Sequence, residues 1–296
     1  MSQSIASRLI VADNSGFSSN AIGVAFNECS LVGQRTNIMH QGHRGTRQRA
    51  SCRARTVTDK SGGNITGNFG VQEIDWFLTR GIGYTPGGAS PYIPGETIPE
   101  WYAIVDKVAA IYVYNKLRVA SMEISGQESQ YLNWSVVTAG ELEQVYGSTY
   151  PTTPVPECGT AFVFSDCTLT YNSTAYKMQS FRLAIDNALD QNQYENSLTP
   201  TRFEAQDLGV QLTVQTAFRS DTLALYDAAL AGAEASLAVT DGTTTYTFHF
   251  GNLKYMAGGP TVPGRGRINQ SLTFEAMRKA NTTTNADDNQ LRIVKS

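Results

Sequence analysis

The segment Tyr112-Val113-Tyr114-Asn115-Lys116-Leu117 decides how this chain is built, together with Phe248-His249-Phe250-Gly251-Asn252-Leu253 later in the sequence. Both segments alternate aromatic with other residues and end on Leu, which is typical of a strand with one face against a core. Asn133-Trp134-Ser135-Val136 and Asn269-Gln270-Ser271-Leu272 then follow at the same offset in numbering, because 253 − 117 and 269 − 133 are equal. The pattern predicts one structural unit that occurs twice.

The likeness between the two halves continues upstream, as a duplication requires. Phe26-Asn27-Glu28-Cys29-Ser30-Leu31 is similar to Phe164-Ser165-Asp166-Cys167-Thr168-Leu169 at a nearly equal offset (164 − 26). Gly70-Val71-Gln72 is similar to Gly209-Val210-Gln211, again at a nearly equal offset (209 − 70). Because the blocks keep the same order, we interpret the chain as a tandem duplication. The Cys of each Phe-to-Leu block then occupies an equivalent place and is expected to be a small buried hydrophobic residue.

Length and composition agree with two β-rich domains. The chain has 296 residues, 41% of them hydrophobic and 17% charged, and a net charge of −3. This length predicts about two domains of ~150 residues each, and the many Thr, Ser, Tyr and Phe residues favour strands and turns. Neither a signal peptide nor a membrane-spanning segment is expected. The small net charge gives no reason to expect general affinity for nucleic acid.

The expected domain boundaries follow the repeat and the Pro-rich segment between its copies. They are an N-terminal arm (1–21), a first module (22–150), a linker (151–157), a second module (158–279) and a C-terminal arm (280–296).

The two halves are expected to differ next to one strand. Residues 67–80 are expected to form a long strand that corresponds to the strand at 209–219. Residues 221–232 follow with Asp at the start, an Ala/Leu-rich body and a final Gly, which predicts a short helix. The helix is expected to pack on the sheet through its apolar residues Leu223, Tyr226 and Leu230. Residues 81–95 are dense in Pro and Gly and predict an exposed loop instead.

Several segments are candidates for contacts between subunits. Residues 35–60 form the one basic run of the chain, which could bind phosphate or dock on acidic patches of a neighbouring subunit. The short apolar segment at 291–294 is expected to add as a strand to the sheet edge of another chain. The candidate contact residues are Arg44, Arg47, Arg49, Tyr84, Tyr92, Leu291, Ile293 and Val294.

No catalytic, cofactor-binding or metal-binding residue is expected. The histidines of the basic run lack a close Cys pair, and the surrounding arginines would repel a metal ion. Neither a nucleophile elbow nor a phosphate-binding loop is present in the sequence. Glu73 with Asp75 and Asp186 with Asp190 could each act as a carboxylate pair, but such acids are more often exposed residues of strands.

A series of motifs in the second half points to one known family. They are Phe162-Val163-Phe164-Ser165-Asp166, the segment from Phe181 to Asn187, Pro200-Thr201, the alternating strand from Val210, the helix ending Leu230-Ala231-Gly232, and Leu272-Thr273-Phe274-Glu275-Ala276. Together they resemble the tail tube proteins of long-tailed bacteriophages, specifically those whose tube module is duplicated within one chain.

This resemblance implies a mainly β fold of two tandem tail-tube-like modules, each a β-sandwich or half-barrel, the second with a flanking short α-helix. It implies a structural virion protein without cofactors, which assembles in the host cytoplasm into the phage tail. Rings of six modules are common in the family, so two modules per chain imply trimeric, pseudo-hexameric rings stacked into a tube. The implied partners are further copies of the chain, the tape-measure, tail-terminator and tail-tip proteins, and DNA that passes through the lumen without specific binding or membrane insertion.

Two other classes of function remain open at this stage. A tandem β-sandwich module could recognise carbohydrate or a host surface through an aromatic platform of Tyr84, Tyr92 and Trp101. A hydrolase would depend on a single acid such as Asp75, and it ranks last.

Overall fold

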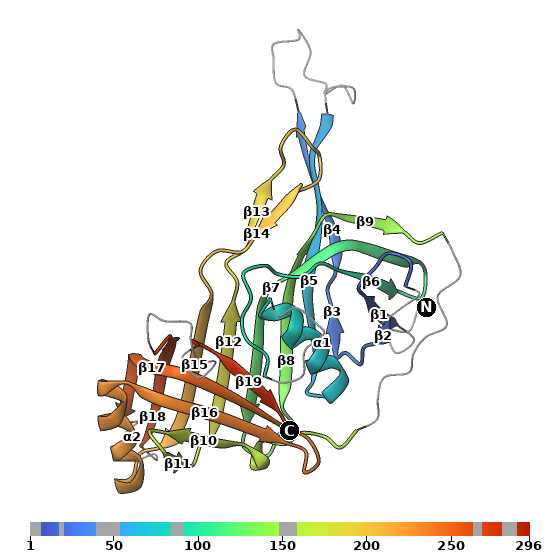
Figure 1. The fold of residues 1–296 in the computed structure, drawn as a ribbon. Helices are drawn as coiled ribbons and strands as arrows, with labels where there is room; N and C mark the ends of the chain where they lie inside the picture. The colour runs from blue at the N-terminus through green and yellow to red at the C-terminus, as the bar shows by residue number, and fades with distance from the viewer. Residues whose placement is uncertain are drawn as a thin grey trace.

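Alternating apolar residues build one large antiparallel sheet that runs through both halves of the chain in the computed structural model (Figure 1). The structure describes residues 7–17, 21–39, 54–83, 91–147, 159–262, 268–279 and 289–296. The predicted fold class, mainly β, is confirmed. The division into two tandem modules and the linker at 151–157 stay predictions, and the linker lies outside the described residues.

The elements of the first half are β1 (Arg8–Ala12), β2 (Ile22–Gly23), β3 (Glu28–Cys29), β4 (Val32–Met39), β5 (Ala54–Asn68), α1 (Val71–Gly81), β6 (Trp101–Asp106), β7 (Ile111–Gln127), β8 (Asn133–Gly140) and β9 (Leu142–Val145). Those of the second half are η3 (Phe164–Asp166), β10 (Thr168–Tyr171), β11 (Thr174–Tyr176), β12 (Ser180–Asp186), β13 (Asp190–Gln193), β14 (Arg202–Glu204), β15 (Gly209–Ala217), α2 (Ser220–Ala231), β16 (Ala233–Thr240), β17 (Thr245–Thr261), β18 (Asn269–Met277) and β19 (Arg292–Lys295).

The two halves share an order of elements and a set of strand pairings. β5, α1, β6, β7 and β8 occur in the same order as β15, α2, β16, β17 and β18. The pairs β5–β8, β6–β7 and β7–β8 recur as β15–β18, β16–β17 and β17–β18. The pairing register shifts between Val119 and Ser121 in β7, and between Tyr255 and Ala257 in β17. These two shifts are as far apart in numbering (255 − 119) as the Tyr112 and Phe248 segments (248 − 112), so they lie at equivalent positions. Shared connectivity and shared irregularities are what a duplicated unit would leave.

Part of residues 67–80 forms a helix, so the predicted long strand there is wrong. β5 ends at Asn68, and α1 begins at Val71. Ile74, Phe77 and Leu78 recur at helical spacing and are fully buried, which favours a helix over a strand. Residues 71–81 therefore match α2, and the first half has a helix of its own ahead of the Pro/Gly-rich segment.

The two cysteines that the repeat placed at equivalent positions are not equivalent. Cys29 lies in β3 opposite Ile65 of β5. Cys167 instead precedes β10, whose partner is β16. Each is partly buried against the core. The prediction of small apolar residues fits their surroundings, but the alignment of the two blocks was wrong.

Helix α2 confirms the predicted helix near 221–232. Tyr226 packs against the core as expected, whereas Leu223 and Leu230 do not. Leu225 and Ala229 are fully buried, whereas Leu223 is 43% exposed and Leu230 is 60% exposed. The helix begins at Ser220, where the Thr222 hydroxyl accepts a hydrogen bond from the Arg219 N–H at 2.8 Å. This start turns Thr222, Leu225 and Ala229 toward the sheet, at i, i+3 and i+7.

Within the predicted N-terminal arm, Arg8–Ala12 form β1 of the sheet. β1 pairs with β2 on one side and with β6 on the other. Its residues from Leu9 to Ala12 are at most 2% exposed. The apolar residues of β1 are therefore covered within the same chain, with β6 as the longer of the two paired strands.

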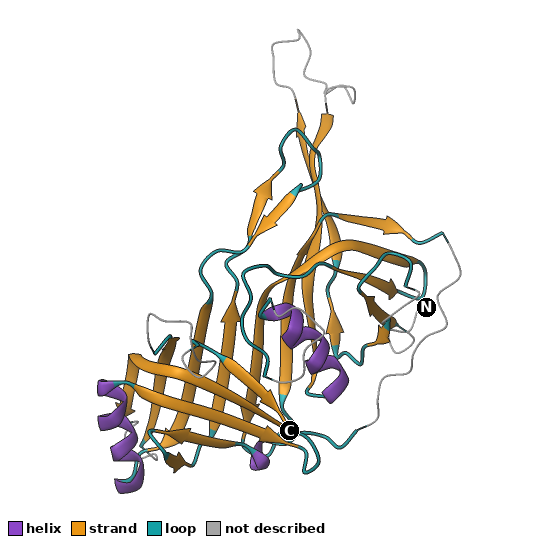
Figure 2. Ribbon diagram, in the orientation of Figure 1, coloured by secondary structure: helices purple, strands orange, loops and turns teal. Residues whose placement is uncertain are grey.

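Both helices lie on the core face of the sheet. Figure 2 shows α1 lying over one face of the central strands and α2 at the far end of the second half. Phe77 of α1 packs against Trp101 and Trp134, with ring centroids 5.9 and 4.8 Å apart. Leu225 of α2 belongs to the same hydrophobic core. In the described part of the chain, the opposite face of the sheet carries no helix.

The packing face of α2 can be tested with two matched substitutions on the same helix. Leu225→Ala removes a fully buried side chain, so we expect the free energy of unfolding to fall by about 2–5 kcal/mol. Leu223→Ala makes the same chemical change at an exposed position. Because Ala is at least as good a helix former as Leu, the free energy of unfolding should fall by no more than about 0.5 kcal/mol. Denaturant unfolding of the unassembled chain measures both. A cost for Leu223→Ala equal to that for Leu225→Ala would contradict the observed packing face.

Candidate functional site

The two halves of the chain are joined through a continuous pair of strands, here called the seam (Ser121–Gln127 of β7 with Ser180–Asp186 of β12). The strands are antiparallel and in unbroken register, from Ser180 opposite Gln127 to Asp186 opposite Ser121. Apolar residues on the core side of the seam are at most 2% exposed; they are Met122, Ile124, Phe181, Leu183 and Ile185. The seam therefore joins the halves through backbone hydrogen bonds and through a shared core.

Size complementarity tightens the seam at one position. Phe181 lies opposite Gly126, and a Cβ added to Gly126 would come within 2.9 Å of the Phe181 ring. A large side chain on β12 thus occupies the space that a missing side chain on β7 leaves open. This pairing of a large with a small residue sets the register of the two strands.

Asn187, at the end of β12, connects the seam to the core. Its side chain is 3% exposed and donates hydrogen bonds to the carbonyl oxygens of Gly81 and Val119, at 2.8 and 2.9 Å. Both acceptors belong to the first half, so a buried amide of the second half satisfies them. Sequence reasoning did not single out Asn187, although a polar residue directly after an alternating strand was a usable signal.

A second contact between the halves is the Asp75 cluster (Asp75, Tyr246 and Lys295). The Tyr246 hydroxyl donates to the Asp75 carboxylate at 2.8 Å, and Lys295 forms an ion pair with the same carboxylate. Burial, followed by the negative charge of Asp75, raises the pKa of Tyr246 above its ordinary value. Asp75 thus connects α1 to β17 and β19.

The other carboxylates considered as acid–base pairs also have structural partners. Glu73 is 4% exposed and accepts a hydrogen bond from the Ala25 N–H at 3.1 Å. Asp186 accepts one from the Ala188 N–H at 2.9 Å. Hydrogen bonds from the Asn192 N–H and the Gln193 side chain lower the pKa of Asp190. Each acid stabilises the backbone near it.

The C-terminal strand finds a sheet edge within its own chain. β19 pairs with β17, with Ile293 opposite Phe248 and Lys295 opposite Tyr246. The Tyr92 N–H and carbonyl bond the backbone of Ile293 at 2.7 and 2.9 Å, and Leu291 is fully buried. The expected addition to another chain's edge is thus satisfied internally here.

Of the candidate contact residues, the structure brings together those of the C-terminal strand and Tyr92. A role for Tyr92, Leu291, Ile293 and Val294 between subunits stays a prediction that requires β19 to leave its own sheet. The candidates Arg44, Arg47, Arg49 and Tyr84 lie outside the described residues.

The aromatic platform expected for carbohydrate binding does not form around Trp101. Its side chain is fully buried. Tyr92 is half-buried and engaged with Ile293. A stacking platform needs exposed rings, so this reading of Trp101 is wrong.

The face of the sheet opposite the helices, here called the open face, is polar. Its side chains alternate with buried neighbours on β5, β7, β8, β12, β15 and β18. They are Asn64, Thr66, Ser121, Glu123, Ser125, Asn133, Ser135, Val137, Ser180, Arg182, Ala184, Asp186, Gln211, Thr213, Gln215, Ser271, Thr273 and Glu275. Hydroxyl and amide groups predominate in this set.

Hydrogen bonds across neighbouring strands order the open face. Ser135 donates to the Asn64 side chain at 2.8 Å, and the hydroxyls of Thr213 and Thr273 lie 3.3 Å apart. Arg182 forms an ion pair with Glu123 across the seam at 2.7 Å. The positive charge of Arg182 is therefore matched locally, and the face presents hydroxyl and amide groups with little positive charge.

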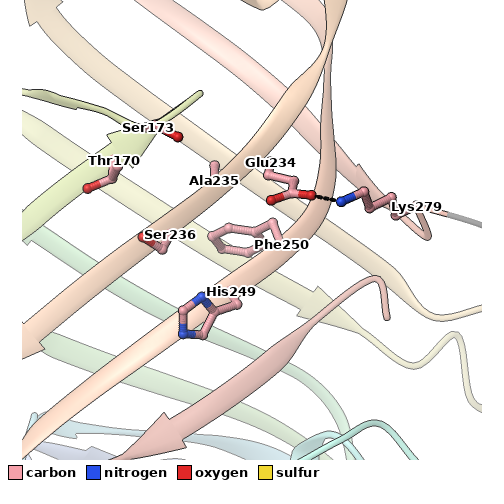
Figure 3. A pocket seen from close by; sticks show the side chains of 8 residues that line it. All are labelled: Thr170, Ser173, Glu234, Ala235, Ser236, His249, Phe250 and Lys279. Atoms are coloured by element: carbon pink, nitrogen blue, oxygen red, sulfur yellow. Dashed lines mark hydrogen bonds and ion pairs between the residues drawn. The ribbon is translucent and has the colours of Figure 1, made fainter. Parts of the chain in front are cut away.

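A pocket of ≈ 370 Å³ lies on the second half, lined by Thr170, Ser173, Glu234, Ala235, Ser236, His249, Phe250 and Lys279 (Figure 3). Ser236 lies directly opposite His249 on neighbouring strands. The acid of the pocket, Glu234, is ion-paired with Lys279. A catalytic triad needs a carboxylate that orients the histidine, and this one is engaged elsewhere.

The described residues offer little chemistry for a metal or a nucleophile. Among them, no group of three or more His, Cys, Asp or Glu could hold a metal ion. Burial raises the pKa of Cys167 to about 12, which disfavours the reactive thiolate. Within the same described part of the chain, no helix is long and apolar enough to cross a membrane.

Comparison with known proteins gives one family. Residues 20–276 match the family described as phage tail tube protein. A search of curated proteins found no match.

The protonated state of Tyr246 leads to a pH dependence of stability. A phenol whose pKa is raised by folding stabilises the chain fully below its unfolded pKa of about 10, and this contribution is lost as the pH rises toward the folded pKa. We expect the free energy of unfolding to fall between about pH 9 and about pH 11, by about 1.4 kcal/mol per pH unit above pH 10 from this residue.

Tyr246→Phe should make this fall less steep, because the phenol is gone, whereas Tyr131→Phe changes a 55% exposed tyrosine and should keep the wild-type slope. Denaturant unfolding at a series of pH values measures the slopes. Equal slopes for wild type and Tyr246→Phe would contradict the assigned role of Tyr246.

Proposed function

Because the match over residues 20–276 makes this chain a member of the phage tail tube protein family, a structural protein of the virion tail, we propose that three copies form each ring of the tube. The rings then have pseudo-hexameric symmetry, and their stack forms the conduit for DNA delivery.

The observation that carries this proposal is the seam. The first half contributes the strand order β4-β5-β8-β7, and the second half contributes β12-β15-β18-β17. The seam joins β7 to β12, so one chain holds two similar sections of sheet side by side. If six such sections close a ring, as the family resemblance implies, three chains are needed.

The open face supports the role of a conduit. A sheet that closes into a ring has one face inside, and the helices α1 and α2 occupy the opposite face. The open face then lines the lumen with hydroxyl and amide groups. DNA binds proteins mainly through positive charges on its phosphates, and Arg182 is already paired with Glu123. Such a lining lets DNA pass without specific binding.

A projecting ribbon supports contact between stacked rings. β4 and β5 extend away from the body of the sheet, with the hairpin β13–β14 beside them (Figure 1). The Asp59 N–H donates to the Leu198 carbonyl at 2.7 Å, which ties the ribbon to the loop that joins β13 and β14. Exposed apolar side chains occur there, with Ile38 at 55%, Met39 at 36% and Leu198 at 52%. Apolar groups gathered on a projection favour burial against a neighbour.

We assign the ribbon, together with the 40–53 segment that follows β4 and carries Arg44, Arg47 and Arg49, to the contact with the next ring. Head-to-tail stacking leaves a different surface exposed at each end of the tube. These ends are the proposed sites for the tail-terminator and tail-tip proteins, and the lumen is the proposed site for the tape-measure protein.

Cryo-electron microscopy of the purified, polymerised protein tests this function. The expected result is hollow tubes whose rings look sixfold at low resolution and become threefold when α1 and α2 are resolved, because the halves differ in detail. Protein that stays monomeric under all conditions, or rings in which six whole chains surround the lumen, would contradict the proposal.

A further inference from the structure

Two of the sheet edges that have no strand partner among the described residues belong to β17 and to β3 with β4. β17 beyond Leu253 pairs with β18 on one side, and no described strand lies on its other side. Among the described strands, β3 and β4 pair with β5 on one side only. Unpaired edges of this length invite another strand.

These two edges correspond to the two strands of the seam. β17 matches β7 at the offset given by the shared register shifts (255 − 119). Because β5 matches β15, the strands that pair with them also match. Val32 lies opposite Gly62 of β5, and Ala184 lies opposite Gln211 of β15, so β3 and β4 match β12 at a second offset (184 − 32). Glu28 and Ser180 give this second offset as well (180 − 28).

We propose that Ala257–Val262 of one copy pairs antiparallel with Cys29–Gln34 of a second copy, in the register of the seam. In the seam, Arg182 lies opposite Ser125 and Phe181 lies opposite Gly126. The residues that correspond to them by the two offsets place Ser30 opposite Thr261 and Cys29 opposite Val262. The partner is thus a second copy of this chain. The inference rests on the proposed ring and adds the joint between its chains.

Side-chain sizes at the proposed joint complement each other as they do in the seam. The seam has a large residue on β12, Phe181, opposite Gly126. The equivalent positions reverse the sizes, with Cys29 facing Val262. Val262 is 72% exposed in the single chain and would be covered by the joint, because Cys29 opposite it is equivalent to Phe181 on the core side of the seam.

In the single chain, side chains form hydrogen bonds with backbone groups along the β3–β4 edge. The Gly33 N–H donates to the Glu143 carboxylate. The Leu31 carbonyl accepts hydrogen bonds from Lys107 and from the Tyr114 hydroxyl, each at 2.8 Å. A second copy must displace Glu143 before its strand can reach Gly33. These side chains therefore protect the edge before assembly.

The other edge is protected by its own sequence. Gly258 and Gly259 have φ of +117° and +142°, a conformation that side chains disfavour. Pro260 lacks the N–H that a strand partner would accept. The joint between chains is thus shorter and weaker than the seam, which fits an assembly that forms only when the ring closes.

Cross-linking between chains tests the register. Ser30 and Thr261 are exposed and directly opposite in the proposed joint, so cysteines there would have Cβ atoms about 4.5–5.5 Å apart, within reach of a disulfide. The double variant Ser30→Cys/Thr261→Cys should, on mild oxidation of assembled tubes, convert most of the monomer band into linked chains. Linkage should stop at three chains, because the ring closes.

The matched control is Val32→Cys/Thr261→Cys, a diagonal pair about 7–8 Å apart, which should leave most of the protein unlinked. The two single variants and the parent report linkage through the native cysteines. Preferential linkage of the control pair, or no linkage in intact tubes, would overturn the proposed joint while the tubes seen by electron microscopy uphold the tube function. Absence of tubes together with absence of linkage would overturn both.

Discussion

The backbone pairing between β7 and β12 is the constraint on which the structure depends. β7 is 17 residues long and pairs with β6, β8 and β9 of the first half and with β12 of the second half. It therefore connects the strands of both halves into one sheet. Its N-terminal part pairs with β6 and β9, and its C-terminal part joins the second half through β12. Without the seam, each half would expose a strand edge and the core residues behind it.

The sequence predicted the strands at Tyr112–Leu117 and Phe248–Leu253 because they rest on local alternation, and both segments lie in the long strands β7 and β17. It also predicted the helix that ends at Gly232. It failed at residues 71–81, where a three-residue likeness to Gly209-Val210-Gln211 outweighed the helical spacing of Ile74, Phe77 and Leu78. The seam and the Asp75 cluster could not be predicted, because contacts between residues far apart in the chain leave no local pattern.

The same kind of joint occurs within the chain and, by our proposal, between chains. The inner joint is long, apolar on one side and fixed by Phe181 over Gly126, so it forms as the chain folds. The outer joint would combine a proline-containing edge with one whose polar groups are held by Glu143, Lys107 and Tyr114. This difference explains how a protein that polymerises can first fold as a single chain.

The central claim is that the seam makes the two halves one cooperative sheet, and native-state hydrogen exchange of the unassembled chain tests it most directly. The account predicts that seam amides such as those of Ile124 and Leu183 exchange only through global unfolding, as slowly as the amide of Trp134 in β8. Exchange of the seam amides through a much smaller opening, with β8 still protected, would show that the halves separate as independent domains and would contradict the account.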